Sequence, residues 1–338
     1  MVRRCNNVGV RTYVDIIPNH MTGPGRGVGI GGSNWNGDTQ QYPGVPFSRE
    51  HFNMNIPGRC PTSGGIENWG SAIQSRNCML VGLRDLDQGQ SYIRSKIAAA
   101  FNELIDIGVA GFRIDAMKHM WPGDMELLWN EVKSLRADIF GHDAWPFMYH
   151  EIAWSEGEVH PTQYTHLGRP IEFRYLNGLQ DTIKGRDGKK LAYLRNYGRD
   201  WGFLPDDDAV AIVDNHDVQR GANGEPNKVI MFRNYRWYKM INAFMLAWPY
   251  GVTKVMSSYD WKEYIANGHD VNDWIGPPSH PNGTTKNIKI LPDGTCDEEW
   301  VCEHRWRQIF NMVQFRNVVG NAPVSDWWDN GSNHVRRE

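Results

Sequence analysis

Three acidic residues in this chain each close a short, mostly apolar run. Asp115 ends the run Gly-Phe-Arg-Ile-Asp, Glu151 ends Phe-Met-Tyr-His-Glu, and Asp217 ends Ala-Ile-Val-Asp-Asn-His-Asp. Short apolar runs are typical of buried parallel strands, and the carboxyl ends of such strands meet on one face of a parallel barrel. Carboxyl groups that converge in this way can protonate and attack the acetal bond between two sugars. The pattern therefore predicts a barrel with a site for sugar chemistry.

The composition indicates the size of the domain and the kind of partner. The chain has 338 residues, of which 40% are hydrophobic, so it can bury a large core in one big domain or in a barrel with an insertion. Its formal net charge is only -3 and it has no basic block, so we expect no nucleic-acid or membrane partner and a neutral substrate. The fifteen tryptophans offer flat faces for sugar rings, although core packing explains most of them.

The cysteines indicate the redox compartment. Cys60 and Cys78 are closely spaced, as are Cys296 and Cys302, whereas Cys5 stands alone near the start. Two local disulfides with one cysteine left over indicate an oxidising compartment and a partner for Cys5 outside the given chain. The alternative is that all five are reduced thiols of the core.

Segments that read as strands and as helices alternate along most of the chain, which indicates an α/β fold. The helical segments carry apolar stripes, and the first of them ends where a glycine can form a C-cap. The predicted helices are 91–107 with Gly108 as C-cap, 125–135, 233–248 and 303–319, and the predicted strands are 12–17, 111–116, 146–151, 171–175, 209–214 and 251–256.

Two stretches interrupt this alternation. Residues 21–89 are rich in Gly, Asn, Pro and Ser, which is typical of an irregular inserted domain. From residue 322 onward a new turn-rich pattern begins and stops after a few residues, as a truncated domain would. Residues 1–5 do not resemble a signal peptide, so we expect the true N-terminus to lie further upstream.

Four segments, taken together and in order, carry a family resemblance. They are 15–20 (DIIPNH), 111–119 (GFRIDAMKH), 149–151 (YHE) and 213–217 (VDNHD). They resemble the four signature segments of the alpha-amylase family, glycoside hydrolase family 13. Residues 119–124, 267–274 and 276–278 are similar to the animal-type, chloride-dependent members of that family, and the resemblance runs along nearly the whole chain.

The resemblance implies a (β/α)8 TIM barrel, of which strands 3 to 8 are present, with an irregular domain inserted after the third strand. The first two strands and most of a C-terminal β-sandwich would be missing, so we expect an internal fragment. A barrel open at two strands exposes unpaired edges, so we do not expect the chain alone to be a stable enzyme. The expected domains are 1–18 (truncated start of the barrel), 19–89 (inserted calcium-binding domain B), 90–321 (barrel continued) and 322–338 (start of the C-terminal domain).

The resemblance also implies a role for each carboxylate. Asp115 resembles the nucleophile, Glu151 the general acid/base, and Asp217 the third carboxylate, which steadies the distorted sugar. A retaining glycosidase needs two carboxyl groups about 5 to 5.5 Å apart, one ionised and one protonated. Arg113, two residues before Asp115 on the same strand, would keep that aspartate ionised, while crowded negative charge would keep Glu151 protonated.

Five further residues are candidates for binding substrate. His20 and His216 match family residues that hydrogen-bond sugar hydroxyls beside the scissile bond. Lys118 and His119 resemble residues just downstream of the nucleophile, where Lys118 would line the sugar cleft, and Trp69 is a candidate for stacking. A single buried histidine is more often structural, so the assignment of His20 and His216 to sugar binding depends on their positions in the signature segments.

A calcium site is implied by the family and not by spacing. It maps onto the side chains of Asn19 and Asp85 and onto the backbone carbonyls of Arg76 and His119. Calcium takes six to eight oxygen ligands from separated segments, and such an ion would clamp the inserted domain to the barrel.

A chloride site is implied at Arg113, Asn215 and Lys254. The lysine stands where many animal members carry an arginine. Because lysine is a single-point donor, we expect chloride activation with weaker affinity than an arginine form would show. The anion would partly cancel the positive charge near Glu151 and so favour its protonated form.

The resemblance implies a secreted, extracellular, digestive alpha-amylase, a monomer that hydrolyses internal α-1,4-glucosidic bonds of starch, glycogen and malto-oligosaccharides with retention of configuration. Two alternatives stay open. One is a catalytically inactive carbohydrate-binding relative, and the other is a glucosidase or transglycosidase of the same superfamily, which its products would distinguish.

Overall fold

The computed structural model describes residues 1–154, 156–221, 229–297, 299–320 and 322–336. The chain divides into two compact units, Met1–Ile171 and Glu172–Glu338, and each has its own hydrophobic core. The last two residues of the predicted segment 322–338 lie outside the described residues. The division into four domains at 1–18, 19–89, 90–321 and 322–338 stays a prediction.

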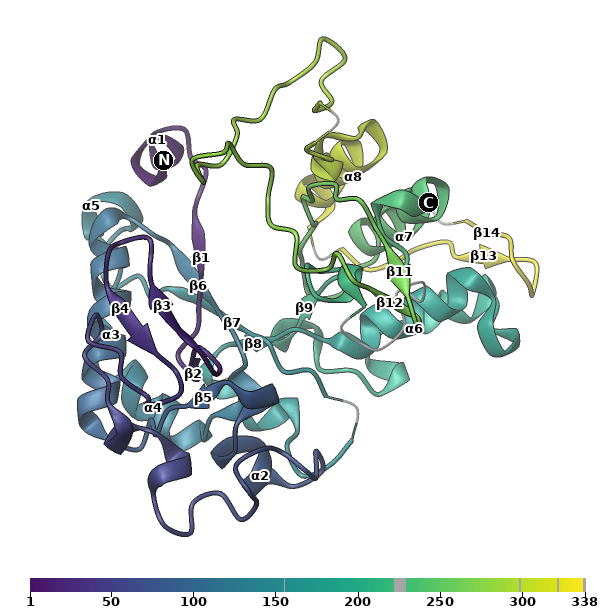
Figure 1. Cartoon of the computed structure of the whole chain (residues 1–338). Helices are drawn as coiled ribbons and strands as arrows, with labels where there is room; N and C mark the ends of the chain where they lie inside the picture. The colour runs from purple at the N-terminus through teal and green to yellow at the C-terminus, as the bar shows by residue number, and fades with distance from the viewer. Residues whose placement is uncertain (155, 222–228, 298, 321, 337–338) are drawn as a thin grey trace. The chain divides into compact units, whose positions relative to one another are not determined.

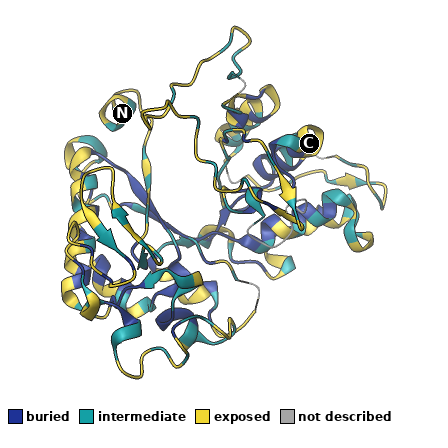
Figure 2. Ribbon diagram, viewed as in Figure 1, coloured by how far each residue is buried: buried dark blue, intermediate teal, exposed yellow. Residues whose placement is uncertain are grey.

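A parallel sheet forms the centre of the first unit (Figure 1). Its strands are β1 (Tyr13–Ile16), β6 (Gly111–Ile114), β7 (Phe147–His150) and β8 (Arg169–Pro170), in the order β1-β6-β7-β8. Every residue of β6 is buried, as expected for a strand between two neighbours (Figure 2). The predicted strands 12–17, 111–116 and 146–151 are confirmed as β1, β6 and β7.

Helix α3 (Ser91–Ile107) confirms the first predicted helix. It buries Ile93, Phe101 and Ile105, and the ring of Phe101 packs against that of Phe112 on β6 with 4.6 Å between centroids. Gly108 ends the helix at a φ of 104°, which only glycine adopts without strain. The other helices of this unit are α1 (Val2–Asn7), α2 (Ala72–Asn77), α4 (Pro122–Trp129) and α5 (Ala137–Phe140), so the predicted helix 125–135 ends earlier than expected.

The stretch 21–89 is irregular, as predicted. Two short antiparallel pairs shape it, β2 (His20–Met21) with β5 (Arg84–Asp85) and β3 (Arg26–Val28) with β4 (Asn34–Asn36). A small core joins it to α3, because Tyr42, Phe52 and Leu86 pack in one cluster with Ile93.

The second unit contains a parallel pair of strands, β9 (Val210–Ala211) and β10 (Val252–Thr253). These strands are shorter than the predicted 209–214 and 251–256. The predicted helices 233–248 and 303–319 are confirmed as α7 (Tyr235–Ala247) and α8 (Arg307–Val319). The described part of this unit also contains α6 (Phe173–Lys184), several short 3-10 helices, and two antiparallel pairs, β11 (Ile265–Ala266) with β12 (His269–Asp270) and β13 (Trp328–Asp329) with β14 (Val335–Arg336).

The prediction of a strand over 171–175 is wrong. Strand β8 ends at Pro170 and helix α6 begins at Phe173. The reason is Glu172, whose carboxylate accepts a hydrogen bond from the Arg174 backbone N–H at 3.1 Å and so caps the helix. A run of five residues rich in apolar and aromatic side chains does not distinguish a strand from the first turn of a buried helix.

The cysteine pairing is confirmed. Disulfides join Cys60 to Cys78 and Cys296 to Cys302, and Cys5 is free. The alternative of five reduced thiols is therefore wrong. Within the described residues no helix is long and apolar enough to cross a bilayer.

Candidate active site and calcium site

One buried arginine joins three carboxylates at the carboxyl ends of β1, β6 and β7. Arg113 Nη1 lies 2.7 Å from Asp15 Oδ1 and 2.8 Å from Asp115 Oδ1, and Nη2 lies 3.1 Å from Glu151 Oε1. Only 4% of the Arg113 side chain is exposed. The structure therefore brings together two of the three predicted catalytic residues, with Arg113 between them.

The strand register explains this convergence. Asp15 and Arg113 are direct partners in the pairing of β1 with β6. The backbone N–H of Asp115 donates to the Ile16 carbonyl, and that of Glu151 donates to the Ile114 carbonyl, so both acids sit just past the strand ends. Glu151 Oε2 also accepts a hydrogen bond from the Ala116 N–H at 3.0 Å.

The charges of this cluster act on its neighbours. Burial lowers the pKa of Arg113, but the negative charges of Glu151 and Asp15 and the hydrogen bond with Asp115 raise it above its ordinary value. Burial lowers the pKa of His20, against the charge of Asp115, which raises it. His20 is thus an electrostatic neighbour of Asp115 and is held neutral, in a form that can both donate and accept a hydrogen bond.

The other predicted sugar-binding residues of the first unit also lie close together. Lys118 Nζ lies 6.0 Å from the centre of the Trp69 ring, and the Trp69 ring meets the edge of the His119 ring at 6.2 Å. Trp69 is 48% exposed, so its face is available to a ligand. His119 is buried, and its Nδ1 lies 2.7 Å from the Ser75 carbonyl oxygen.

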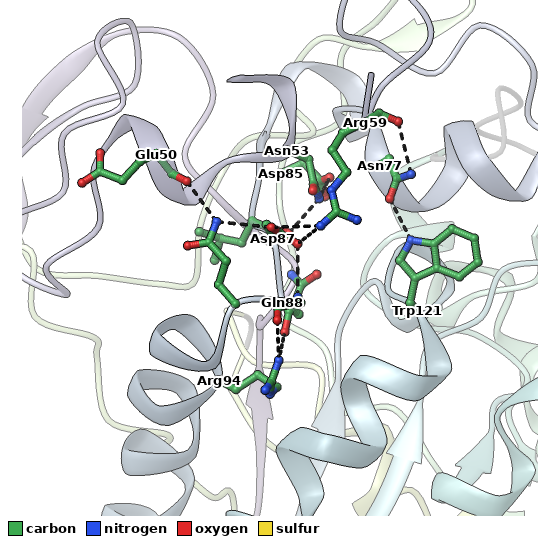
Figure 3. A network of polar contacts seen from close by, with 12 residues as sticks. Glu50, Asn53, Arg59, Asn77, Asp85, Asp87, Gln88, Arg94 and Trp121 are labelled. Atoms are coloured by element: carbon green, nitrogen blue, oxygen red, sulfur yellow. Dashed lines mark hydrogen bonds and ion pairs between the residues drawn. The ribbon is translucent and has the colours of Figure 1, made fainter. Parts of the chain in front are cut away.

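Three of the four predicted calcium ligands meet in one buried place. Asn19 Nδ2 lies 3.0 Å from Asp85 Oδ1 and 3.0 Å from the His119 carbonyl oxygen. Asn53 Nδ2 donates to Asp85 Oδ2 at 2.8 Å (Figure 3). Burial raises the pKa of Asp85 well above its ordinary value, and among the described residues no cationic side chain acts on it. A buried carboxylate without a cation is costly, and Asp85 and the His119 carbonyl offer oxygens to a metal ion. Asn19 presents Nδ2 to both and holds its Oδ1 2.9 Å from His20 Nδ1, so its amide fits a metal site when it is turned to present Oδ1.

The fourth predicted ligand, the Arg76 carbonyl, belongs to the last turn of α2. The Arg76 side chain is buried and donates from Nε to the Tyr164 hydroxyl at 3.0 Å. Among the described residues no cluster of three His, Cys, Asp or Glu side chains could hold a metal, so the predicted site depends on amide and carbonyl oxygens.

A polar network surrounds this region (Figure 3). Gln88 Nε2 donates to the Pro18 and Asn19 carbonyls at 3.0 and 3.1 Å. Arg94 Nη1 in turn donates to the Gln88 carbonyl at 2.8 Å, and Arg59 pairs with Asp87 at 3.3 Å. The chain that follows Asp85 is thereby held in place.

The remaining predicted site residues belong to the second unit. Asn215 Oδ1 accepts hydrogen bonds from the Asp217 and Val218 N–H groups at 3.1 and 2.8 Å, which folds the turn that carries Asp217. His216 Nε2 lies 3.3 Å from Asp217 Oδ2. Lys254 directly follows β10, and its backbone N–H donates to the Ala211 carbonyl of β9 at 2.9 Å.

An open pocket of about 370 Å³ adjoins Asp217. Arg220 lines it and stacks on Trp261 at 4.0 Å and on Tyr259 at 5.1 Å. Trp274, which is 77% exposed, also lines it. Exposed aromatic rings beside a carboxylate can hold a sugar ring by its apolar face.

The sequence reasoning missed three residues that the structure connects to these sites. Asp15 stands in a signature segment, and its register opposite Arg113 could have been inferred from the pairing of two predicted strands. Asn53 contacts Asp85 from an irregular stretch that gave no signal. Asp214 is buried beside Asn215, and burial raises its pKa to about 7, although the hydrogen bond from Gln219 and, more weakly, the charge of Lys254 lower it.

No model of a protein family matches the chain. Curated proteins, in contrast, are similar to the chain over most of its length. The chain is 51% identical over 340 residues to alpha-amylase 1B of Homo sapiens, with 99% of the chain and 66% of that protein covered. It is 50% identical to the pancreatic alpha-amylase of Struthio camelus, with 99% of the chain and 68% of that protein covered. The chain thus spans about two thirds of the length of these relatives.

A solved structure agrees with the sequence comparison. The crystal structure of a mutant of alpha-amylase I from Eisenia fetida in complex with maltohexaose is similar to this chain with a TM-score of 0.94 and 44% identity. The match covers 99% of this chain and 66% of that one. The chain is 50% identical to a relative of which it covers 68%. It also has the same fold as a solved alpha-amylase. On this evidence the chain belongs to the alpha-amylase family.

Proposed function

We propose that the protein is an alpha-amylase that hydrolyses internal α-1,4-glucosidic bonds of starch, glycogen and malto-oligosaccharides with retention of configuration. The observation that carries this proposal is the pair Asp115 and Glu151, held on either side of buried Arg113 at the ends of neighbouring parallel strands. The complex of a solved relative with maltohexaose supports a malto-oligosaccharide as ligand.

The chemistry divides between the two carboxyl groups. Glu151 donates its proton to the glycosidic oxygen, and the Asp115 carboxylate attacks the anomeric carbon, so that the bond to the leaving sugar breaks as the bond to Asp115 forms. Glu151 then takes a proton from water, which displaces Asp115 and restores both groups. Asp217 steadies the positive charge that develops on the sugar ring.

The polar residues around the carboxylates bind the sugar hydroxyls. His20 and His216 hydrogen-bond sugar hydroxyls beside the scissile bond, and Lys118 and His119 line the cleft with Trp69 as a stacking face. These contacts orient the anomeric carbon toward Asp115. Correct positioning of a nucleophile against the atom that it attacks contributes strongly to the rate.

Calcium would be held by Asn19 and Asp85 through their side chains and by Arg76 and His119 through their carbonyls. The ion would supply the positive charge that the buried Asp85 carboxylate lacks. Asn19 directly precedes β2, and Asp85, Arg76 and His119 come from β5, α2 and the 3-10 turn Met117–His119. Together the four residues would join the irregular stretch to the parallel sheet.

Chloride would be held by Arg113, Asn215 and Lys254. The fit rests on Arg113 Nη2, a buried donor that has no well-directed hydrogen bond within the described structure and only an ion pair with Glu151. That ion pair favours the ionised form of Glu151, whereas a general acid must be protonated. A bound anion supplies the compensating negative charge.

The chloride assignment predicts the effect of Lys254→Arg. Two parallel N–H groups grip an anion better than one ammonium, so the variant should bind chloride more tightly, by about 1–2 kcal/mol or roughly 10-fold. The measurement is hydrolysis rate against chloride concentration, with nitrate and sulfate as comparison anions. Rates that do not depend on chloride in either protein would contradict the assignment.

Three further features belong to this proposal. The fold is that of a (β/α)8 barrel with residues 19–89, domain B, as its insertion. The two disulfides favour an oxidising compartment, in line with secretion of a digestive enzyme. The protein acts as a monomer.

The first test is Glu151→Gln, which keeps the size of the side chain and removes its proton. Hydrolysis of starch should fall on the order of 10²–10⁴-fold, while the affinity for maltohexaose stays within a few-fold of the wild type. Glu126→Gln, an exposed position on α4, is the matched control and should keep full activity.

The product mixture distinguishes the alternatives. Mixed short oligosaccharides from starch support an endo-acting amylase. Glucose alone indicates a glucosidase, and longer transfer products indicate a transglycosidase. Binding of maltohexaose without any cleavage by the wild type indicates a carbohydrate-binding relative.

A further inference from the structure

The predicted calcium ligands fall into two pairs that are held together differently. Asn19 and Asp85 contact one another directly at 3.0 Å, and Asn53 holds the second oxygen of Asp85. The carbonyls of Arg76 and His119 are backbone groups, so neither can be oriented by its own side-chain rotamer. Contacts between the two segments therefore fix the distance between them, and one is the contact of His119 Nδ1 with the Ser75 carbonyl oxygen at 2.7 Å.

The hydroxyl of Tyr164 lies between the two carbonyl-bearing segments. It accepts a hydrogen bond from Arg76 Nε at 3.0 Å. It donates toward the carbonyls on either side of His119, with distances of 3.0 Å to the Met120 oxygen and 3.2 Å to the Lys118 oxygen. Tyr164 is completely buried, so water does not compete for these hydrogen bonds.

The side chain of Asn77 makes a second connection between the same segments (Figure 3). Its Oδ1 accepts from Trp121 Nε1 at 2.7 Å, and its Nδ2 donates to the Arg59 carbonyl at 3.2 Å. Asn77 directly follows Arg76, and Trp121 lies two residues beyond His119. Arg76 itself stacks on the Trp121 ring at 4.8 Å.

We propose that Tyr164 and Asn77 are positioning residues of the calcium site, which set the spacing of the Arg76 and His119 carbonyl oxygens. The proposal rests on the calcium site of the proposed function. Neither residue is a metal ligand. Each joins the last turn of α2 to residues 118–121. Each therefore limits the motion of the two backbone segments that carry the ligand carbonyls, so less conformational entropy is lost when calcium binds.

The physical reason is preorganisation. A calcium ion is held by several oxygens, and each oxygen that is not already in place must be ordered when the ion binds. Groups that orient metal ligands from outside contribute about 10–100-fold to metal affinity. In this site the contribution comes from the Tyr164 phenol and the Asn77 amide. Tyr164 lies 88 residues from its partner Arg76, and Asn77 lies 44 residues from its partner Trp121.

The test is Tyr164→Phe, which keeps the buried ring and removes only the hydroxyl. Calcium affinity is measured on EDTA-stripped protein by titration calorimetry or by competition with a fluorescent chelator. We expect a dissociation constant about 10–100-fold weaker than that of the wild type. Asn77→Ala is the second variant and should weaken calcium binding in the same way.

Thermal unfolding separates positioning from general stability. The rise in Tm between EDTA and millimolar calcium reports binding, because a ligand stabilises the folded state according to its concentration and affinity. This rise should shrink in Tyr164→Phe. Tyr250→Phe is the matched control, since Tyr250 is buried and donates to the Leu204 carbonyl at 3.0 Å; it should lower both Tm values and leave the rise unchanged.

Each outcome has a distinct meaning. Wild-type affinity and an unchanged rise in Tm for Tyr164→Phe would overturn the proposal. A wild-type protein that binds no calcium would overturn it together with the calcium assignment. Tighter calcium binding by the wild type than by Tyr164→Phe, in a protein that does not cleave starch, would support the proposal and contradict only the proposed function.

Discussion

At the scale of single residues, Arg113 meets three carboxylates with one positive charge. Asp15, Asp115 and Glu151 all lie within 3.1 Å of its guanidinium group. From the sequence we expect Arg113 to keep Asp115 ionised and its positive charge to lie near Glu151, and the structure adds a direct ion pair with Glu151 at 3.1 Å. The guanidinium therefore acts on both the proposed nucleophile and the proposed acid.

This arrangement predicts a pH effect for Arg113→Met. A nearby positive charge favours the ionised form of a carboxyl group, so its loss makes the proposed acid Glu151 harder to ionise. The limb of the pH profile of kcat/KM that reports this acid should move to higher pH, by about 1–3 units. Arg113→Lys keeps the charge and should move this limb less. A profile that coincides with that of the wild type would show that Arg113 does not control the ionisation of Glu151.

At the scale of elements, helix α6 depends on one buried side chain. Glu172 is 2% exposed, accepts hydrogen bonds from the N–H groups of Arg174 and Leu204, and forms an ion pair with the Arg174 guanidinium at 2.6 Å. It therefore caps the first turn of α6 and also fixes the chain that precedes β9. A strand prediction over this segment was wrong because the cap decides where the helix begins.

This cap predicts the cost of Glu172→Ala. The variant leaves two backbone N–H groups without the acceptor they have in the wild type and removes the ion pair between Arg174 and Glu172. The free energy of unfolding should fall by about 2–4 kcal/mol, measured by urea denaturation. Glu172→Gln retains an acceptor oxygen and should lose less. Equal losses for the two variants would argue that packing, not capping, stabilises this turn.

At the scale of the whole molecule, buried titratable groups control how folding responds to pH. Burial lowers the pKa of His150 from 6.5 to about 3, and the Leu167 backbone, which raises it, offsets only part of this. His150 therefore stays neutral in the folded protein while the unfolded chain takes up a proton. Its effect is absent above about pH 6.5 and destabilises the fold increasingly as the pH falls from 6.5 toward 3.

This linkage predicts the behaviour of His150→Gln. Between pH 7 and pH 4.5 the wild type should lose about 2–3 kcal/mol more free energy of unfolding than the variant, at 1.36 kcal/mol per pH unit. The measurement is urea denaturation at both pH values. His142→Gln, at an exposed position, should show the pH dependence of the wild type. A His150→Gln protein that responds to acid as the wild type does would contradict the linkage.

Local patterns predicted much of the fold. The stripe and the terminal glycine of α3, the apolar runs of β1, β6 and β7, and both disulfides follow from residues near one another in the chain. Such features depend on periodicity, capping and loop length, which are written in a short stretch of sequence. The same reasoning failed at 171–175, because five residues do not distinguish a strand from a helix start.

The residue types at the strand ends, and therefore the kind of chemistry, were determined by the sequence alone: three acids, an arginine and two histidines in ordered segments. Only the tertiary structure decided that Arg113 also pairs with Glu151, that Asn53 holds Asp85, and that Tyr164 joins Arg76 to the carbonyls beside His119. These contacts join residues 32 to 88 positions apart. Spacing carries no information on them, because they arise only when strand register and packing bring separate segments within hydrogen-bonding distance.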